Sequence, residues 1–212
     1  MRILAIETAS EACSVALFED STLLANEHVE LGRGHAERLI PMIAKLPDKG
    51  RADRILVSLG PGSFTGVRIG IAAARALGVA WGSEVLGYPT LALVAVSAWQ
   101  PNPRGVTVCM NGGHGEWFVQ NFDAGGGCDE VRSLSPEMAK AACEHDTIVG
   151  NRAEELTAMF ANGKRALHLL PDASKTYLLH ETQLTRDLTP IYGRAPDAKP
   201  QAQQAQGQKA SS

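Results

Sequence analysis

The stretch LVSLGPGSFTGVRIGIAAARAL at residues 56–77 decides the fold of this chain. The apolar run 55–57 predicts a strand, residues 60–63 predict a turn, and the residues after them predict a helix. A strand, a glycine-rich turn and a helix in this order point backbone N–H groups at an anion. The turn lacks the lysine of a Walker loop. We therefore expect an α/β protein with an anion-binding turn of a different kind.

The predicted helix at 65–77 has little side-chain bulk. Gly66, Gly70, Ala73 and Ala74 are small, and each glycine costs about 1 kcal/mol relative to alanine, so the two glycines serve a purpose. Two interpretations stay open: close packing inside the same domain, or a helix–helix contact with another chain. Arg68 in this helix could reach an anion, reach a carboxylate of a neighbouring chain, or only solvate the helix.

Composition narrows the class of protein. The 212 residues suffice for one large or two small domains. With 20 basic and 23 acidic residues and a net charge of −3, the chain lacks the basic surplus of an autonomous nucleic-acid binder. Its 4 cysteines include no C-x-x-C pair, which argues against a zinc ribbon. Without a signal peptide or an apolar run of membrane length, the cytoplasm is the expected compartment.

The pattern along the chain predicts two halves. Residues 2–6, 13–18 and 22–29 are expected as strands, and so are residues 106–110 and 116–122, which flank a glycine-rich turn. Both halves therefore begin strand, turn, strand. We assign residues 1–101 to an N-terminal lobe, residues 102–196 to a C-terminal lobe and residues 197–212 to a disordered tail without an apolar pattern. Further strands are expected at 85–86 and 147–149, and helices at 34–46, 91–99, 135–143, 153–160 and 173–184.

Few side chains suggest chemistry. Glu7 follows the first strand and either holds a metal-bound nucleotide or caps the neighbouring turn. His35 is either a partner contact or a cap, and Ser63 with Thr65 fits a helix N-cap better than a nucleophile. No two histidines lie three or four residues apart, so no helix displays a paired metal site. His114, close to Glu116 in sequence, is either catalytic or an exposed turn residue.

Four segments carry a resemblance to a known family. They are ILAIETA at 3–9 continuing to CSVAL at 13–17, HAERLIP at 35–41, GPGSFTGVRIG at 60–70 and PIYGR at 190–194. On these segments the chain resembles the TsaB (YeaZ) family, and GPGSFTGVRIG is the most specific of them. The resemblance implies an actin-like, sugar-kinase-type (ASKHA) fold with two ribonuclease-H-like lobes.

The resemblance also implies a function and partners. TsaB-like proteins are non-catalytic scaffold subunits that pair with the catalytic relative TsaD in threonylcarbamoyladenosine modification of tRNA. TsaE joins this complex, and the subunit contacts tRNA only as part of the complex. The subunit forms a homodimer when it is alone, and no membrane is involved. Carried onto this chain, the partner interface comprises His35, Leu39, Ser63, Thr65, Gly66, Arg68, Ile69, Gly70, Ala73 and Ala74.

The same resemblance speaks against catalysis. TsaD holds a metal through H-x-x-x-H on a helix, and this chain has His35 followed by Leu39 at the second position, so neither a metal site nor a catalytic residue is expected. No intrinsic cofactor is expected either, although ATP or ADP could bind at the complex interface near Glu7, Gly60, Gly62 and Ser63. This chain departs from the family at two places. Glu7 stands where the family usually has Asp, and residues 111–116 keep only the Gly-Glu end of the family motif D-A-R-x-G-E. The alternative is a nucleotide hydrolase or glycoprotease-like hydrolase acting on its own.

Overall fold

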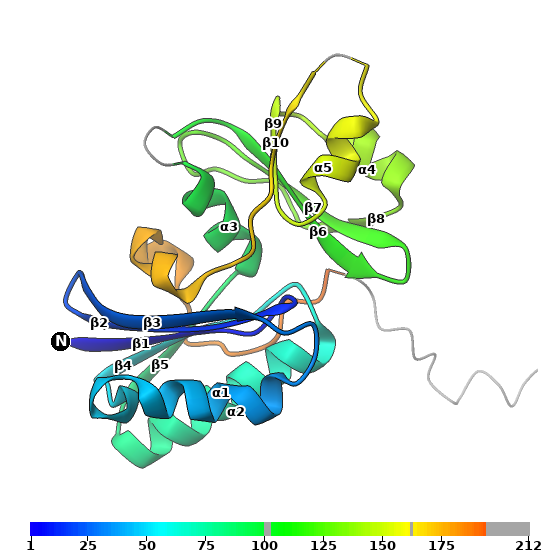
Figure 1. The fold of residues 1–212 in the computed structure, drawn as a ribbon. Helices are drawn as coiled ribbons and strands as arrows, with labels where there is room; N and C mark the ends of the chain where they lie inside the picture. The colour runs from blue at the N-terminus through cyan, green and yellow to red at the C-terminus, as the bar shows by residue number, and fades with distance from the viewer. Residues whose placement is uncertain (100–102, 162, 194–212) are drawn as a thin grey trace, which may run out of the picture.

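A computed structural model describes residues 1–99, 103–161 and 163–193, which form two five-stranded sheets (Figure 1). The first sheet has the order β3-β2-β1-β4-β5. β1 pairs antiparallel with β2 and parallel with β4, β2 pairs antiparallel with β3, and β4 pairs parallel with β5. These strands are β1 (Arg2–Glu7), β2 (Ala12–Glu19), β3 (Thr22–Glu30), β4 (Arg54–Ser58) and β5 (Glu84–Tyr88).

The second sheet repeats this topology. Its order, read from the corresponding edge, is β8-β7-β6-β9-β10, with the β6–β7 and β7–β8 pairs antiparallel and the β6–β9 and β9–β10 pairs parallel. Its strands are β6 (Val106–Gly113), β7 (Glu116–Phe122), β8 (Arg132–Leu134), β9 (Thr147–Val149) and β10 (Arg165–Leu167). The expected actin-like fold with two ribonuclease-H-like lobes is therefore confirmed, and so is the shared beginning of the two halves.

Helices cover both faces of the first sheet (Figure 1). α1 (His35–Lys45) and α2 (Phe64–Trp81) lie on one face and enclose a core that includes Leu4, Ile6 and Val57. α3 (Thr90–Ala98) and the 3₁₀ segment η2 (Ala173–Leu178) cover the other face. β1 and β2 are buried along most of their length, which fits their almost continuous apolar sequence.

α3 joins the two lobes. Its Leu93 packs with the first sheet, and its Leu91 and Val94 pack with the second. The outer face of the second sheet is covered by α4 (Pro136–Ala142) and α5 (Ala153–Ala158) (Figure 1). The sequence of α3 is apolar on all sides, which is typical of a helix that is buried between two layers.

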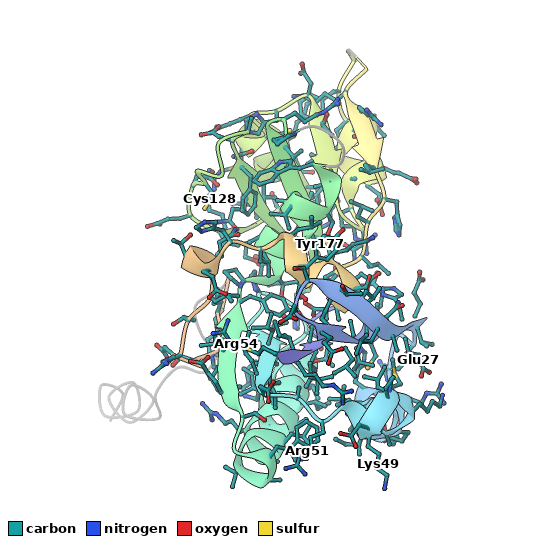
Figure 2. The ribbon with its side chains drawn as sticks, turned by 90° about the vertical axis from the view of Figure 1, so that its left-hand side faces the viewer. Glu27, Lys49, Arg51, Arg54, Cys128 and Tyr177 are labelled. Atoms are coloured by element: carbon teal, nitrogen blue, oxygen red, sulfur yellow. The ribbon has the colours of Figure 1, made fainter. Side chains whose placement is uncertain are left out.

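The chain returns to the first lobe at its end. Thr185 and Gly87 exchange two backbone hydrogen bonds, and the N–H of Ile191 donates to the Leu59 carbonyl at 2.8 Å. Arg54, labelled in Figure 2, lies at the start of β4. Its Nη1 donates to Oε1 of Glu181, in the 3₁₀ segment η3 (Glu181–Gln183), at 2.9 Å. Residues 173–193, which the sequence assigned to the C-terminal lobe, therefore lie against the first sheet.

Several local predictions need correction. Residues 173–184 form the two 3₁₀ segments instead of one helix, and β8 and β10 were missed. The sequence pattern predicts Ile40 on the apolar face of this helix, but Ile40 is 50% exposed. The buried apolar residues of α1 are Leu39, Met42 and Ile43. The short 3₁₀ segment η1 (Pro47–Gly50) follows α1, in a stretch where the sequence predicts neither a helix nor a strand.

Two predictions fall on the undescribed parts of the chain. The lobe boundary at 101/102 and the tail 197–212 lie outside the described residues. Across residues 1–99, 103–161 and 163–193, no helix is long and apolar enough to cross a membrane.

Candidate functional site

A cleft with a volume of about 870 Å³ lies between the two lobes. Ligand sites commonly have this size and lie at such junctions. Five parts of the chain line the cleft: the turn after β1, Gly32 after β3, the glycine turn and start of α2 with Thr90, the β6–β7 hairpin with Asn151, and the C-terminal segment. The lining residues are Ala9, Ser10, Glu11, Gly32, Pro61, Gly62, Ser63, Phe64, Arg68, Thr90, Met110, Asn111, Gly112, Gly113, His114, Phe118, Asn151, Ile191, Tyr192 and Gly193.

The glycine turn uses its polar groups inside the protein. The Ser63 N–H donates to the Ala9 carbonyl at 2.7 Å, and Ser63 Oγ accepts the Gly66 N–H at 3.2 Å, which confirms Ser63 as the N-cap of α2. Gly60 is buried, donates its N–H to Ser58 Oγ at 3.4 Å and accepts the Thr90 N–H through its carbonyl at 2.8 Å. Of the four residues predicted to bind a nucleotide or anion, only Gly62 and Ser63 line the cleft.

Glu7 lies inside the first lobe, away from the cleft wall. Its side chain is fully buried, Oε1 accepts the Ala9 N–H at 2.6 Å, and Oε2 accepts the Tyr88 hydroxyl at 3.3 Å. Burial raises the pKa of the Glu7 carboxyl from 4.5 to about 7, although the hydrogen bonds from Ala9 and Tyr88 act in the opposite direction. The carboxyl holds the turn after β1, as the capping interpretation of this residue predicts.

One face of α2 is closed against its own sheet. Gly66, Gly70, Ala74 and Gly78 are all buried. A Cβ at Gly66 would lie 2.1 Å from the Thr8 carbonyl oxygen, and one at Gly70 would lie 2.4 Å from Thr8 Oγ1. The assignment of Gly66, Gly70 and Ala74 to a surface contact is wrong, because these positions allow the helix to approach the sheet.

The opposite face of α2 is open. Of the predicted interface residues, Ser63, Thr65 and Arg68 are exposed, and Ile69 and Ala73 are partly buried. The same face also carries exposed small or apolar residues that the sequence did not assign to it, namely Ala72, Ala76, Val79 and Ala80. Helical spacing from Arg68 would have indicated them once the buried face was known.

The two predicted interface residues of α1 are in the core. Leu39 is 1% exposed and belongs to the core of the first lobe. His35 is buried, and its Nε2 lies 3.2 Å from the Ala12 carbonyl oxygen. The N-cap of α1 is Gly34, with no side-chain hydrogen bond. His35 is therefore neither an exposed contact nor a cap, but a residue that ties α1 to β2.

Arg68 joins a cluster at the mouth of the cleft that the sequence did not predict. Its guanidinium carbon lies 3.2 Å from the centre of the Phe64 ring and 5.4 Å from that of Tyr192. Arg68 Nη2 donates to the Tyr192 hydroxyl at 2.5 Å. The only signal for this cluster was that Phe64 and Tyr192 both stand in segments of the family resemblance.

Other residues that line the cleft link the two lobes. Asn151 Nδ2 donates to both carboxylate oxygens of Glu11, at 2.8 and 2.9 Å, and Asn151 Oδ1 accepts the Asn111 N–H. His114 is exposed on the β6–β7 turn, while Glu116 Oε2 accepts the Ser133 hydroxyl at 2.6 Å. Within the described residues, no three His, Cys, Asp or Glu side chains gather so that they could hold a metal ion.

Comparison with known proteins agrees with this arrangement. Residues 27–163 match the family described as "TsaD: tRNA N6-adenosine threonylcarbamoyltransferase". The chain is 45% identical over 182 residues to the Escherichia coli "tRNA threonylcarbamoyladenosine biosynthesis protein TsaB", covering 82% of this chain and 76% of the relative. The solved structure of YeaZ from Pseudomonas aeruginosa is similar with a TM-score of 0.76 at 25% identity, covering 90% of this chain and 99% of the other. The identity and its extent show that the chain belongs to the TsaB (YeaZ) family.

Proposed function

We propose that this chain is a non-catalytic scaffold subunit in threonylcarbamoyladenosine modification of tRNA. In this role it pairs with the catalytic TsaD subunit, is joined by TsaE, and meets tRNA only through the complex. Family membership supports the pathway, since relatives are named tRNA threonylcarbamoyladenosine biosynthesis proteins. The observation that carries the pairing is the open face of α2.

This face suits a helix of another chain. Ala72, Ala76 and Ala80 are exposed, and Val79 is 87% exposed. Small side chains let a second helix approach closely, and apolar ones gain stability when they are buried in the contact. The pairing proposed here therefore uses Thr65, Arg68, Ala72, Ala76 and Val79, and not the glycines on the reverse side.

The proposal includes no catalytic residue. Glu7, the acid suggested for nucleotide chemistry, is buried and hydrogen bonded inside the first lobe. Leu39 occupies the position of the second histidine of H-x-x-x-H and belongs to the core. ATP or ADP, if the complex needs one, would lie at the interface with TsaD, so the chain needs no cofactor of its own.

Size-exclusion chromatography with light scattering tests the pairing, using this chain mixed with TsaD of the same genome. We expect a one-to-one complex that Ala76→Glu abolishes, because an unpaired charge buried in a helix contact is strongly unfavourable. Arg165→Glu, an exposed position on β10 of the second lobe, is the matched control and should leave the complex intact. A full complex with Ala76→Glu and also with Ala72→Glu would rule out this face.

A further inference from the structure

Another hollow lies on the outer side of the second lobe, where the ends of α4 and α5 meet the start of β10. It has a volume of about 660 Å³, and its lining includes Lys140, Lys164, Arg165, Phe160 and Asp146. This basic pocket shares none of its described lining residues with the cleft between the lobes. Figure 1 shows α4, α5 and β10 at the opposite end of the molecule from α1 and α2.

The ring of Phe160 holds two of the cations in place. Lys164 Nζ lies 4.8 Å from the centre of this ring and Lys140 Nζ lies 5.5 Å from it, so both are within the range of cation–π attraction. Lys164 Nζ also donates to the His145 carbonyl at 2.8 Å, which uses one of the three N–H groups of an ammonium. Two lysine side chains are therefore ordered around one ring before a ligand binds, which lowers the entropy cost of binding.

The positive charge of the basic pocket is largely uncompensated. Lys140 and Arg165 are exposed, and neither forms an ion pair with any residue that the structure describes. Lys164 Nζ lies 3.7 Å from Asp146 Oδ1, but the Asp146 side chain is fully exposed, and an exposed pair of this length is weak. The pocket thus gathers three cations on a chain whose net charge is −3.

Three cations from separate elements suit an anion whose charges are spread along a strand. Each lysine acts as a point charge, and an arginine can bind two oxygens of one phosphate. The pocket opens on the surface, so a passing backbone can reach it without being enclosed. Because the chain has no basic surplus, one such pocket adds to a nucleic-acid contact made elsewhere and does not replace it.

We propose that the basic pocket holds the phosphate backbone of the tRNA, through Lys140, Lys164 and Arg165. Contacts with phosphates position an RNA but carry no sequence information. The inference rests on the proposed function, because the pairing with TsaD brings the tRNA to this surface. The pairing uses α2 at the other end of the molecule, so the pocket and the pairing do not compete (Figure 1).

Binding of a labelled tRNA to the complex of this chain with TsaD, followed by fluorescence anisotropy at several salt concentrations, tests the proposal. Lys140→Gln/Arg165→Gln should weaken binding roughly tenfold and lower the slope of log affinity against log salt by about 2, because two phosphate contacts are lost. Lys140→Arg keeps the charge and should bind like the unchanged chain. Phe160→Leu should weaken binding less and keep the slope, because it leaves the charges but orders them less well.

The matched control removes two charges outside the pocket. Lys49→Gln/Lys175→Gln changes exposed residues of η1 and η2 and should leave the salt slope unchanged. Equal thermal unfolding of the variants would show that the losses are local.

Light scattering of the same samples separates this inference from the proposed function. An unchanged chain that fails to pair with TsaD would overturn both. A Lys140→Gln/Arg165→Gln chain that pairs with TsaD and binds tRNA with the original affinity and slope would overturn the basic pocket alone. Stronger competition by polyglutamate than by polyuridylate of the same charge would also overturn it, and would identify an acidic protein segment as the occupant.

Discussion

The two faces of α2 carry similar small residues, but one face is buried and the other is exposed. The buried face carries Gly66, Gly70 and Gly78, and the exposed face carries Ala72 and Ala76. On the buried face any side chain at Gly66 or Gly70 would collide with Thr8. On the exposed face Ala72 and Ala76 remain accessible within the part of the chain that the structure describes. Small residues in a helix thus indicate close approach, but they do not say to what.

The buried face shows what the close approach provides. Thr8 Oγ1 donates to the Gly66 carbonyl at 2.8 Å, and the Ala9 carbonyl accepts the Ser63 N–H, so the turn after β1 is bonded directly to the helix backbone. Each buried hydrogen bond contributes about 1 kcal/mol, which offsets the low helix propensity of glycine. The glycines are therefore structural, and the variants below separate this role from that of the exposed alanines.

The largest effect should come from Gly66→Ala. In an isolated helix this change would stabilise by about 1 kcal/mol, but here the new Cβ meets a backbone oxygen, and we expect a loss of about 4 kcal/mol in the free energy of unfolding. Urea unfolding followed by circular dichroism measures it. The control is Ala72→Gly on the exposed face, which should lose about 1 kcal/mol through propensity alone. A more stable Gly66→Ala protein would contradict our account of this face.

The stability of the first lobe should also depend on pH, through the buried carboxyl of Glu7. The pKa of Glu7 is raised from 4.5 to about 7, so the folded state binds its proton more tightly than the unfolded state does. The resulting stabilisation is complete below pH 4.5 and is lost as pH rises towards 7, by as much as about 3 kcal/mol.

Urea unfolding measured at several pH values across this window tests the contribution of Glu7. Glu7→Gln should remove most of the loss, because the amide keeps the shape of the side chain but has no proton to release. An identical pH profile in the two proteins would show that Glu7 titrates normally.

Much of the fold could be predicted from the sequence, because strands and turns leave recognisable patterns within short segments. The apolar runs at 2–6 and 106–110, each followed by a turn and a second strand, predicted the two equivalent lobes. β8 (RSL) and β10 (RAL) have only three residues each and, unlike the equally short β9 (TIV), contain no β-branched residues that would indicate a strand. Residues 173–178 form a 3₁₀ segment whose start is fixed by a distant contact, since the Ala173 N–H donates to Ser14 Oγ at 2.6 Å.

The candidate site was less predictable because its residues meet only through the fold. Arg68 and Tyr192 lie 124 positions apart in the sequence, and their contact depends on the return of the C-terminal segment to the first lobe. Likewise, Glu7 is held inside the first lobe by a hydrogen bond from Tyr88 of β5, which lies 81 positions along the chain. Spacing within one segment contains no information on such contacts.

The smallest effect on stability, and the sharpest test of the exposed face, should come from Val79→Lys. Val79 is 87% exposed, so replacing it should change the free energy of unfolding by no more than about 0.5 kcal/mol. If the open face of α2 also pairs two copies of this chain when TsaD is absent, the added charge should convert a dimer to a monomer in light scattering. Arg51→Glu, an exposed change outside α2, should leave the dimer intact. A dimer that survives Val79→Lys would place self-association on another surface, while the buried face would keep its role, because that role rests on contacts within a single chain.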